Sequence, residues 1–322
     1  MVEASRAGPE FDLIARIRAR AATREDVVLG IGDDAALLHV PPGELLVVAT
    51  DTLNRGVHFP GETAPADIGW KSLAVNLSDL AAMGARPAWC TLSLSLPDGD
   101  VAWVDAFLDG FLALAAQHDV ALVGGDTTRG PLSVCVTMHG LVAPGVVLRR
   151  DRACVGDDIW VSGHLGDAAA ALVQWRAGAA IDPLLRARLD RPTPRVALGQ
   201  SLAGIAHACI DVSDGLLADL SHVCAASAAG AEVDIDALPA SSTLQESFAG
   251  DARRHVQATG GDDYELCFTA PQAMREEVSS RAAATGVHVT RIGRVGAGSG
   301  LHTRLRDGSA WTATARGYVH FE

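Results

Sequence analysis

Apolar and polar residues repeat with two different periods in the first half of the chain, which predicts a mixture of strands and helices. Period-two alternation and short apolar runs predict strands, whereas apolar positions three and four residues apart predict helices. The strands are predicted at 44–51, 90–97, 119–126 and 132–142, and the helices at 66–87 and 101–118. Leu73, Leu77 and Leu80 form the apolar stripe of the first helix, which Gly84 and Pro87 should end. The strand at 119–126 should end in a glycine turn.

A charged stretch at 148–158 separates this half from a second series of alternating elements. Strands are predicted at 159–163, 208–212, 231–236, 264–269 and 287–295, and helices near 166–178, 194–206, 215–229 and 272–285. Since 322 residues exceed the usual size of one core, we expect two domains, residues 1–150 and 151–322. The predicted fold class is mixed α/β.

Composition and charge exclude several classes of protein. The formal net charge of −13 argues against general binding to nucleic acids, which requires basic surface. No apolar run approaches about 18 residues, so no membrane span is predicted, and the charged start lacks the apolar core of a secretory signal. The six cysteines contain no C-x-x-C pair, which favours reduced thiols and a cytoplasmic location over disulfides or zinc.

Adjacent aspartates occur in the stretch GIGDDAALL, residues 30–38. Asp33 and Asp34 are explained either by a turn, for which Gly-Asp is suited, or by a bound cation. The triplet GDD recurs at 156–158, where it precedes a strand and favours a turn, and at 261–263. The triplet alone therefore does not distinguish the two roles.

Other aspartates also follow an apolar strand or a glycine turn. They are Asp51, Asp126, Asp211, Asp214, Asp262 and Asp263, and Asp79 shares a helix face with Asn76. If strand ends gather these carboxylates in one crevice, the repulsion between two of them about 4 Å apart amounts to roughly 4 kcal/mol at an effective dielectric near 20. Cations between them would remove this cost, and ligands made only of oxygen select Mg²⁺.

Glycine-rich segments beside these aspartates suggest phosphate binding without a P-loop. Gly124 and Gly125 in LVGGDTTRG would let the backbone approach a phosphate, with Asp126 holding its Mg²⁺. In DVSDG, Ser213 or Asp214 is equally well explained as a helix N-cap, and the same helix start could receive an anion. No G-x-x-x-x-G-K-[ST] sequence occurs in the chain.

Three other residues have ordinary structural explanations when taken alone. His58 would have a structural role, Lys71 would be a solvated or interface charge, and Tyr318 would pack near the chain end. Lys71 is the only lysine in the sequence, so any grip on phosphate must come from arginine, backbone amides or metal.

Several segments in order resemble the thiamine-monophosphate kinase family of the aminoimidazole-ribonucleotide-synthetase-like superfamily. The matching segments are FDLIARI, GIGDDAALL, TDTL with GVHF, KSLAVNLSDLAAMGARP, LVGGDTTRGPLS, GDDIWVSGHLGDAAA, RPTPRVALGQ, IDVSDGLLADLSHV, GGDDYELCFT and RGYVHF. The resemblance implies transfer of the γ-phosphoryl group of ATP to thiamine monophosphate, with several Mg²⁺ ions per site. It also implies a homodimer whose N-terminal domains pair their sheets.

The resemblance also implies roles for individual residues. The implied metal ligands are Asp34, Thr50, Asp51, Asp79, Asp126, Asp211 and Asp214, of which Asp51, Asp79 and Asp126 would be catalytic. The implied ATP contacts are Gly125, Asp126, Arg150 and Ser213, and the implied substrate contacts are His58, Asp262 and Tyr318. Two positions depart from the family pattern. Ala49 stands where a hydroxyl residue is common, and Asp262 stands where glutamate is common.

Direct in-line transfer fits this residue set, since no nucleophile suited to a covalent intermediate is evident. The acceptor phosphate is largely ionised near neutral pH, because the second pKa of a monoester is about 6, so no general base is required. Two alternatives stay open: an ATP-using enzyme of the same superfamily with another acceptor, and a binding protein that consumes no ATP. Selenophosphate synthesis is disfavoured, because the first cysteine is Cys90.

Overall fold

The structure is a computed structural model that describes residues 9–313 and residue 317. The chain divides into two compact units. The first comprises the residues up to Asn76 together with Pro87–Val142, and the second comprises Leu77–Arg86 and the residues from Ala143 onward. Helix α2 (Pro65–Ala82) contributes to both units. The division into domains at residue 150 stays a prediction.

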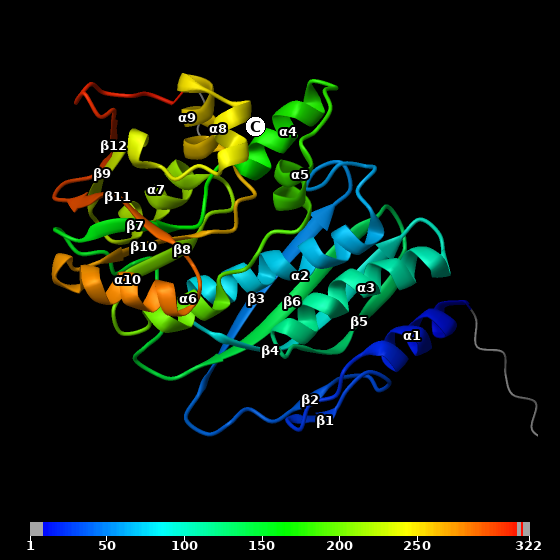
Figure 1. The fold of residues 1–322 in the computed structure, drawn as a ribbon. Helices are drawn as coiled ribbons and strands as arrows, with labels where there is room; N and C mark the ends of the chain where they lie inside the picture. The colour runs from blue at the N-terminus through cyan, green and yellow to red at the C-terminus, as the bar shows by residue number, and fades with distance from the viewer. Residues whose placement is uncertain (1–8, 314–316, 318–322) are drawn as a thin grey trace, which may run out of the picture. The chain divides into compact units, whose positions relative to one another are not determined.

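The first unit is built on a four-stranded sheet with the order β3-β6-β4-β5. Its strands are β3 (Leu45–Asn54), β4 (Arg86–Leu96), β5 (Ala121–Arg129) and β6 (Ser133–Val142). Strand β3 runs antiparallel to β6, and β4 runs parallel to β5. Figure 1 shows α2 and α3 (Val101–Gln117) lying along this sheet, and α1 (Pro9–Arg20), β1 (Val27–Leu29) and β2 (Leu37–Leu38) complete the unit.

Glycines allow close contact between α2 and α3. A Cβ atom at Gly69 would lie 2.1 Å from the carbonyl oxygen of Phe107, and one at Gly110 would lie 1.7 Å from that of Ala66. Only glycine fits at such distances. The side chain of Asp100 starts α3 by accepting hydrogen bonds from the amides of Ala102 and Trp103. The predicted apolar stripe of α2 is fully buried, which explains why this helix forms.

The second unit contains a six-stranded sheet with the order β12-β9-β11-β7-β10-β8. Its strands β12 and β9 run parallel, and its other described neighbours run antiparallel. Its strands are β7 (Asp158–Ser162), β8 (Ala208–Asp211), β9 (Gly230–Asp234), β10 (Leu266–Ala270), β11 (Val289–Gly296) and β12 (Gly300–Arg304). Its helices are α4 (Asp167–Arg176), α5 (Pro183–Asp190), α6 (Val196–Leu202), α7 (Leu216–Ala226), α8 (Ser242–Ser247), α9 (Gly250–Thr259) and α10 (Arg275–Ala284). Ile159, Val161, Ile210 and Leu216 are among the buried residues of its core.

The predicted mixed α/β class with two units is confirmed, but some element boundaries are wrong. Helix α2 ends at Ala82 and β4 already begins at Arg86, so Pro87 lies inside a strand. Strand β5 continues to Arg129 and does not end at a glycine turn. Helices α5, α8 and α9 and strand β12, none of them longer than 10 residues, were not predicted. Within residues 9–313 and 317, no helix is both long and apolar enough to span a membrane.

Candidate active site

A cavity of about 1130 Å³ opens in the first unit between α1, the loop after β1 and the strands β4 and β5. Three carboxylates line it, those of Asp33, Asp34 and Asp126. Apolar residues make up another part of the wall, with Ile17 and Leu122 both buried. The cavity is large enough for a nucleotide and combines apolar surface with converging polar groups, as ligand sites do.

The two adjacent aspartates of the GIGDD loop have different surroundings. The carboxylate of Asp33 accepts a hydrogen bond of 2.8 Å from the backbone amide of Asp34. Asp33 is therefore a turn residue. The carboxylate of Asp34 is exposed, and it accepts no hydrogen bond from the part of the chain that the structure describes. Asp34 is thus the member of the pair that remains available to a ligand.

Gly125 is required by strand packing. Its φ is +146°, and a Cβ atom there would lie 1.8 Å from the carbonyl oxygen of Leu92 on β4. The approach of a phosphate to the backbone at Gly124 and Gly125 stays a prediction; the structure adds a packing reason for glycine at 125, whereas Gly124 has space around it. The next residue, Asp126, is exposed and stands opposite Ser93 in the parallel β4–β5 ladder. The sharp backbone at Gly125 thus places a carboxylate at the cavity.

Strand alternation separates two residues predicted to share a metal. The amide of Asp51 donates a hydrogen bond of 3.1 Å to Oδ1 of Asn76 on α2. The hydroxyl of Thr50 lies 3.0 Å from that of Thr137, directly across on β6. Because successive side chains of a strand point to opposite faces, Thr50 and Asp51 cannot both direct their side chains at one ion. The Thr50 side chain therefore lies on the face of β3 that pairs with Thr137, and a metal-binding role for Thr50 stays a prediction.

The loop after β3 is held by a buried lysine. Nζ of Lys71 donates a hydrogen bond of 3.1 Å to the backbone carbonyl of His58, and Lys71 is only 1% exposed. The expectation of a solvated or interface charge is thus wrong for Lys71. The ring atom Nδ1 of His58 accepts a hydrogen bond of 2.9 Å from the amide of Asn54, which fixes the half-buried ring beside the end of β3.

In the second unit, two loops that are far apart in sequence lie side by side. The amide of Asp262 donates to the carbonyl of Ser213 at 2.9 Å, and the amide of Tyr264 donates to that of Val212 at 2.8 Å. Asp262 and Tyr264 both have positive φ, at 69° and 48°. Aspartate tolerates this left-handed conformation better than most residues do. The structure thereby brings together Asp262, Ser213 and the neighbouring Asp214.

The helix start after DVSDG is capped from within the chain. Gly215 is the N-cap residue of α7, and its position rules out the predicted N-cap role of Ser213 or Asp214. The carboxylate of Asp219 instead accepts hydrogen bonds from the amides of residues 213, 214 and 215, at 3.0, 3.1 and 3.1 Å. Burial, followed by repulsion from Asp211 and Asp214, raises the pKa of Asp219 to about 7. The backbone amides that could have received an anion at this helix start therefore donate to a side chain of the protein.

Strand β8 ends beside the last turns of α2. The hydroxyl of Ser78 donates a hydrogen bond of 2.7 Å to the carboxylate of Asp211, which is buried at the end of β8. Asp79 is the next residue of the helix. Arg150 is exposed in this unit, and its carbonyl accepts from the hydroxyl of Ser227. Tyr318 lies outside the described residues.

Two acidic residues hold the GGDDYE loop in place: Asp263, which the sequence placed among the converging carboxylates, and Glu265, which it did not single out. Glu265 is fully buried and accepts hydrogen bonds from Arg188, Arg195 and the hydroxyl of Ser162. Both oxygens of Asp263 accept from the amide of Gly166 at the start of α4, and burial raises its pKa well above the ordinary value. The one signal that could have indicated that these acids hold the loop is the pairing of Arg188 and Arg195 with the GGDDYE segment.

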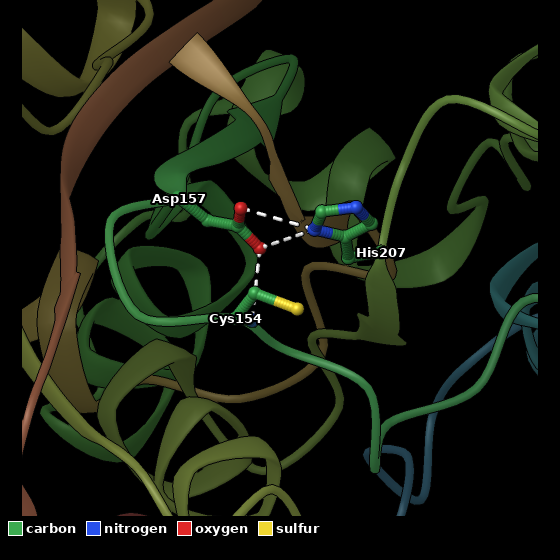
Figure 2. A group of neighbouring side chains, drawn as sticks. All are labelled: Cys154, Asp157 and His207. Carbon is green, nitrogen blue, oxygen red and sulfur yellow. Dashed lines mark hydrogen bonds and ion pairs between the residues drawn. The ribbon is translucent and has the colours of Figure 1, made fainter.

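The GDD at 156–158 leads from a turn into the interior strand β7, as the turn interpretation predicted. Figure 2 shows the carboxylate of Asp157 bonded to both the His207 ring and the backbone amide of Cys154. Asp157 also accepts from the hydroxyl of Thr269. One atom able to ligate a metal from each of Cys154, Asp157 and His207 lies within 4.8 Å of the others. The carboxylate is already satisfied by protein donors, so its contacts are those of a structural residue.

These features define a protein of the AIR synthase related class. The chain belongs to this family, since it matches the AIR synthase related N-terminal domain over residues 32–142 and the C-terminal domain over residues 155–306. Hydrogenase maturation protein HypE in complex with ATP has the same fold, with a TM-score of 0.77 at 21% identity and coverage of 96% of this chain and 94% of that one.

Within this class, the chain belongs to the thiamine-monophosphate kinase family. It is 46% identical to the thiamine-monophosphate kinase of Salmonella typhimurium over 97% of this chain and 98% of the relative. The crystal structure of the kinase from Stenotrophomonas maltophilia K279a matches with a TM-score of 0.87 and 59% identity, covering 94% of this chain and 98% of that one. A complex of AaThiL with AMPPCP and TMP matches with a TM-score of 0.77 and 31% identity, covering 97% and 96%.

Proposed function

We propose that this protein transfers the γ-phosphoryl group of ATP to the phosphate of thiamine monophosphate, giving thiamine diphosphate and ADP. The observation that carries the proposal is the carboxylate-lined cavity of the first unit, in a chain that shares 46% identity with thiamine-monophosphate kinases over nearly its full length. The related complex with AMPPCP and TMP supports the same pair of substrates.

Magnesium is part of this proposal. Asp34 and Asp126 offer exposed carboxylates without protein partners among the described residues, and their oxygen donors suit Mg²⁺ rather than a softer metal. Asp51, Asp79, Asp211 and Asp214 are proposed as further ligands. When bound, Mg²⁺ supplies positive charge that offsets the negative charge of the two reacting phosphates.

The residues of the chain would act by positioning rather than by proton transfer. Asn76 fixes the backbone at Asp51, Gly125 places Asp126 at the cavity, and Lys71 fixes the loop that carries His58. The acceptor phosphate is already ionised for the most part at neutral pH, so an in-line displacement needs no general base. Gly125, Asp126, Arg150 and Ser213 are proposed to contact ATP, and His58, Asp262 and Tyr318 to contact thiamine monophosphate.

A homodimer formed through β3 is also proposed. Strand β3 is an edge strand of its sheet, and Leu45, Leu46 and Val48 on it are 50%, 47% and 55% exposed. An apolar edge of this kind favours association with another strand. Val48→Asp should convert a dimer to a monomer in light scattering, and an unchanged mass would contradict this interface. The six free cysteines support the further proposal of a cytoplasmic location.

Activity can be tested directly on the purified chain with ATP, Mg²⁺ and thiamine monophosphate. We expect thiamine diphosphate and ADP in equal amounts, and no turnover once the magnesium is chelated. ADP formed only with another phosphorylated acceptor would indicate a different member of the superfamily. Binding of thiamine monophosphate without any ADP would indicate a binding protein, and either result would overturn the proposed activity.

A further inference from the structure

The three arginines of helix α1 do not face the same surroundings. Nη1 of Arg16 pairs with the carboxylate of Asp105 at 2.8 Å, and Nη2 of Arg20 pairs with that of Asp109 at 2.5 Å. Both acceptors lie on α3, and residues four apart share a helix face. Arg16 and Arg20 therefore fasten α1 to α3.

Arg18 lies between them in sequence and points to a different side of the helix. Its guanidinium lies against Gly32 of the GIGDD loop, where a Cβ atom would be 2.5 Å from Nη1 and 2.9 Å from Cζ. Among the side chains that the structure describes, those of residues 13–313 and 317, Arg18 finds no hydrogen-bond or ion-pair partner. Glycine at position 32 thus leaves room for a guanidinium that has no partner in the described protein.

The same side chain lines the cavity described above. Arg18 is the basic residue among the described residues of its wall, whose charged members otherwise are the carboxylates of Asp33, Asp34 and Asp126. A polyphosphate in this cavity would meet those negative charges, and an arginine can offset them with two parallel N–H donors. The sequence has no P-loop lysine to do this.

We propose that Arg18 is a phosphate-binding residue for the nucleotide, and that α1 forms one wall of the nucleotide site. The inference rests on the proposed function, which supplies ATP as the ligand. A nucleotide is favoured over thiamine monophosphate because Gly125 and Asp126 line this cavity, whereas His58 does not. The apolar wall beside Arg18, which includes Ile14 and Ile17, suits the nucleobase or ribose end of such a ligand.

The test compares Arg18→Gln with Arg16→Gln, which removes a neighbouring arginine from the same helix. Calorimetric titration with AMPPCP and Mg²⁺ should give a Kd about tenfold higher for Arg18→Gln, as expected for loss of a charge-assisted hydrogen bond at an open site. Arg16→Gln should stay within about twofold, because it loses only an exposed ion pair. Arg18→Lys should fall between the two, since lysine keeps the charge without the fork.

Two further measurements separate phosphate binding from a purely electrostatic role beside the carboxylates. Adenosine should bind Arg18→Gln and the unaltered protein equally, and the KM for ATP should rise while that for thiamine monophosphate stays within about twofold. If Arg18 only shields Asp33 and Asp34, Arg18→Gln should bind Mg²⁺ alone more tightly and AMPPCP no less tightly. That result would overturn the inference, as would an equal loss of adenosine binding.

Failure of the proposed function would look different. The unaltered protein would then bind AMPPCP but form no thiamine diphosphate, and the comparison of Arg18→Gln with Arg16→Gln would still decide whether Arg18 holds phosphate. Circular dichroism of each variant controls for loss of α1, which should keep its two ion pairs with α3 when Arg18 is replaced.

Discussion

The carboxylates of the two units differ in burial although both units carry them in or beside glycine-aspartate segments. In the first unit, Asp34 and Asp126 are exposed at a cavity. In the second, Asp263 and Glu265 are buried and accept hydrogen bonds from a helix start, two arginines and a serine. The hydrogen-bond donors around a carboxylate, rather than the GDD triplet, therefore decide whether it can bind a cation.

A buried carboxylate saturated by protein donors has no lone pairs left for a metal, and its loss leaves the donors unsatisfied. An exposed carboxylate without donors has the opposite properties, because its removal affects the ligand and leaves the protein core intact. Substitutions in the first unit should therefore change catalysis with little effect on stability. Substitution of Asp263 or Glu265 in the second should change stability first, because both are buried and hydrogen-bonded.

The largest effect is expected for Asp126→Asn. Loss of one carboxylate from the proposed magnesium set should lower kcat about a thousandfold, which corresponds to roughly 4 kcal/mol of transition-state stabilisation. The melting temperature should stay unchanged, because Asp126 is exposed. Steady-state kinetics at saturating Mg²⁺ together with calorimetry would check both. Unaltered turnover would remove Asp126 from the site.

Glu265→Gln should reverse that pattern. Replacing the buried carboxylate leaves Arg188 and Arg195 facing an uncharged group, and breaking a buried pair in this way costs about 3 kcal/mol of unfolding free energy. Urea unfolding measures the change. Glu277→Gln is the matched control, since the Glu277–Arg281 pair is exposed and should contribute less than about 0.5 kcal/mol. Equal losses for both variants would contradict the distinction between buried and exposed carboxylates.

Sequence patterns predicted the periodic elements well and the loop-borne contacts poorly. The helical period of α2 and the period-two alternation of β6 are both clear in the sequence. The apolar positions that define these periods are buried in the structure. The GDD loops at 32–34 and 261–263 have similar local sequences. They differ in their partners, because Arg188 and Arg195 donate to Glu265 beside the second loop from some seventy residues away. Such long-range partners are set by the tertiary fold and leave no local periodicity.

An effect confined to a pH window is expected for Asp219→Asn. The folded pKa of Asp219 is about 7, above the unfolded value of roughly 4, so the folded protein holds the extra proton between these values. The unfolding free energy should therefore fall as pH rises from 4 to 7, by at most about 1.4 kcal/mol per pH unit from this group.

Asparagine can still accept the three amide hydrogen bonds but cannot ionise, so the variant should lack this slope. Urea titrations at pH 4, 5.5 and 7 in the presence of a chelator would show the variant gaining stability relative to the unaltered protein as pH rises. Parallel curves over the three pH values would mean that Asp219 is already ionised in the folded protein.

The smallest effect is expected for Asp33→Asn, next to a residue proposed to bind metal. Asp33 lines the same cavity as Asp34 but uses its carboxylate to accept the Asp34 amide, and asparagine can accept that bond equally well. Turnover should stay within about twofold and stability within about 0.5 kcal/mol. Asp34→Asn should instead lower kcat, because its carboxylate has no bond to keep within the described protein. If Asp33→Asn lowered kcat as much as Asp34→Asn, both carboxylates would serve the ligand, and hydrogen bonding within the free protein would no longer identify which acids bind it.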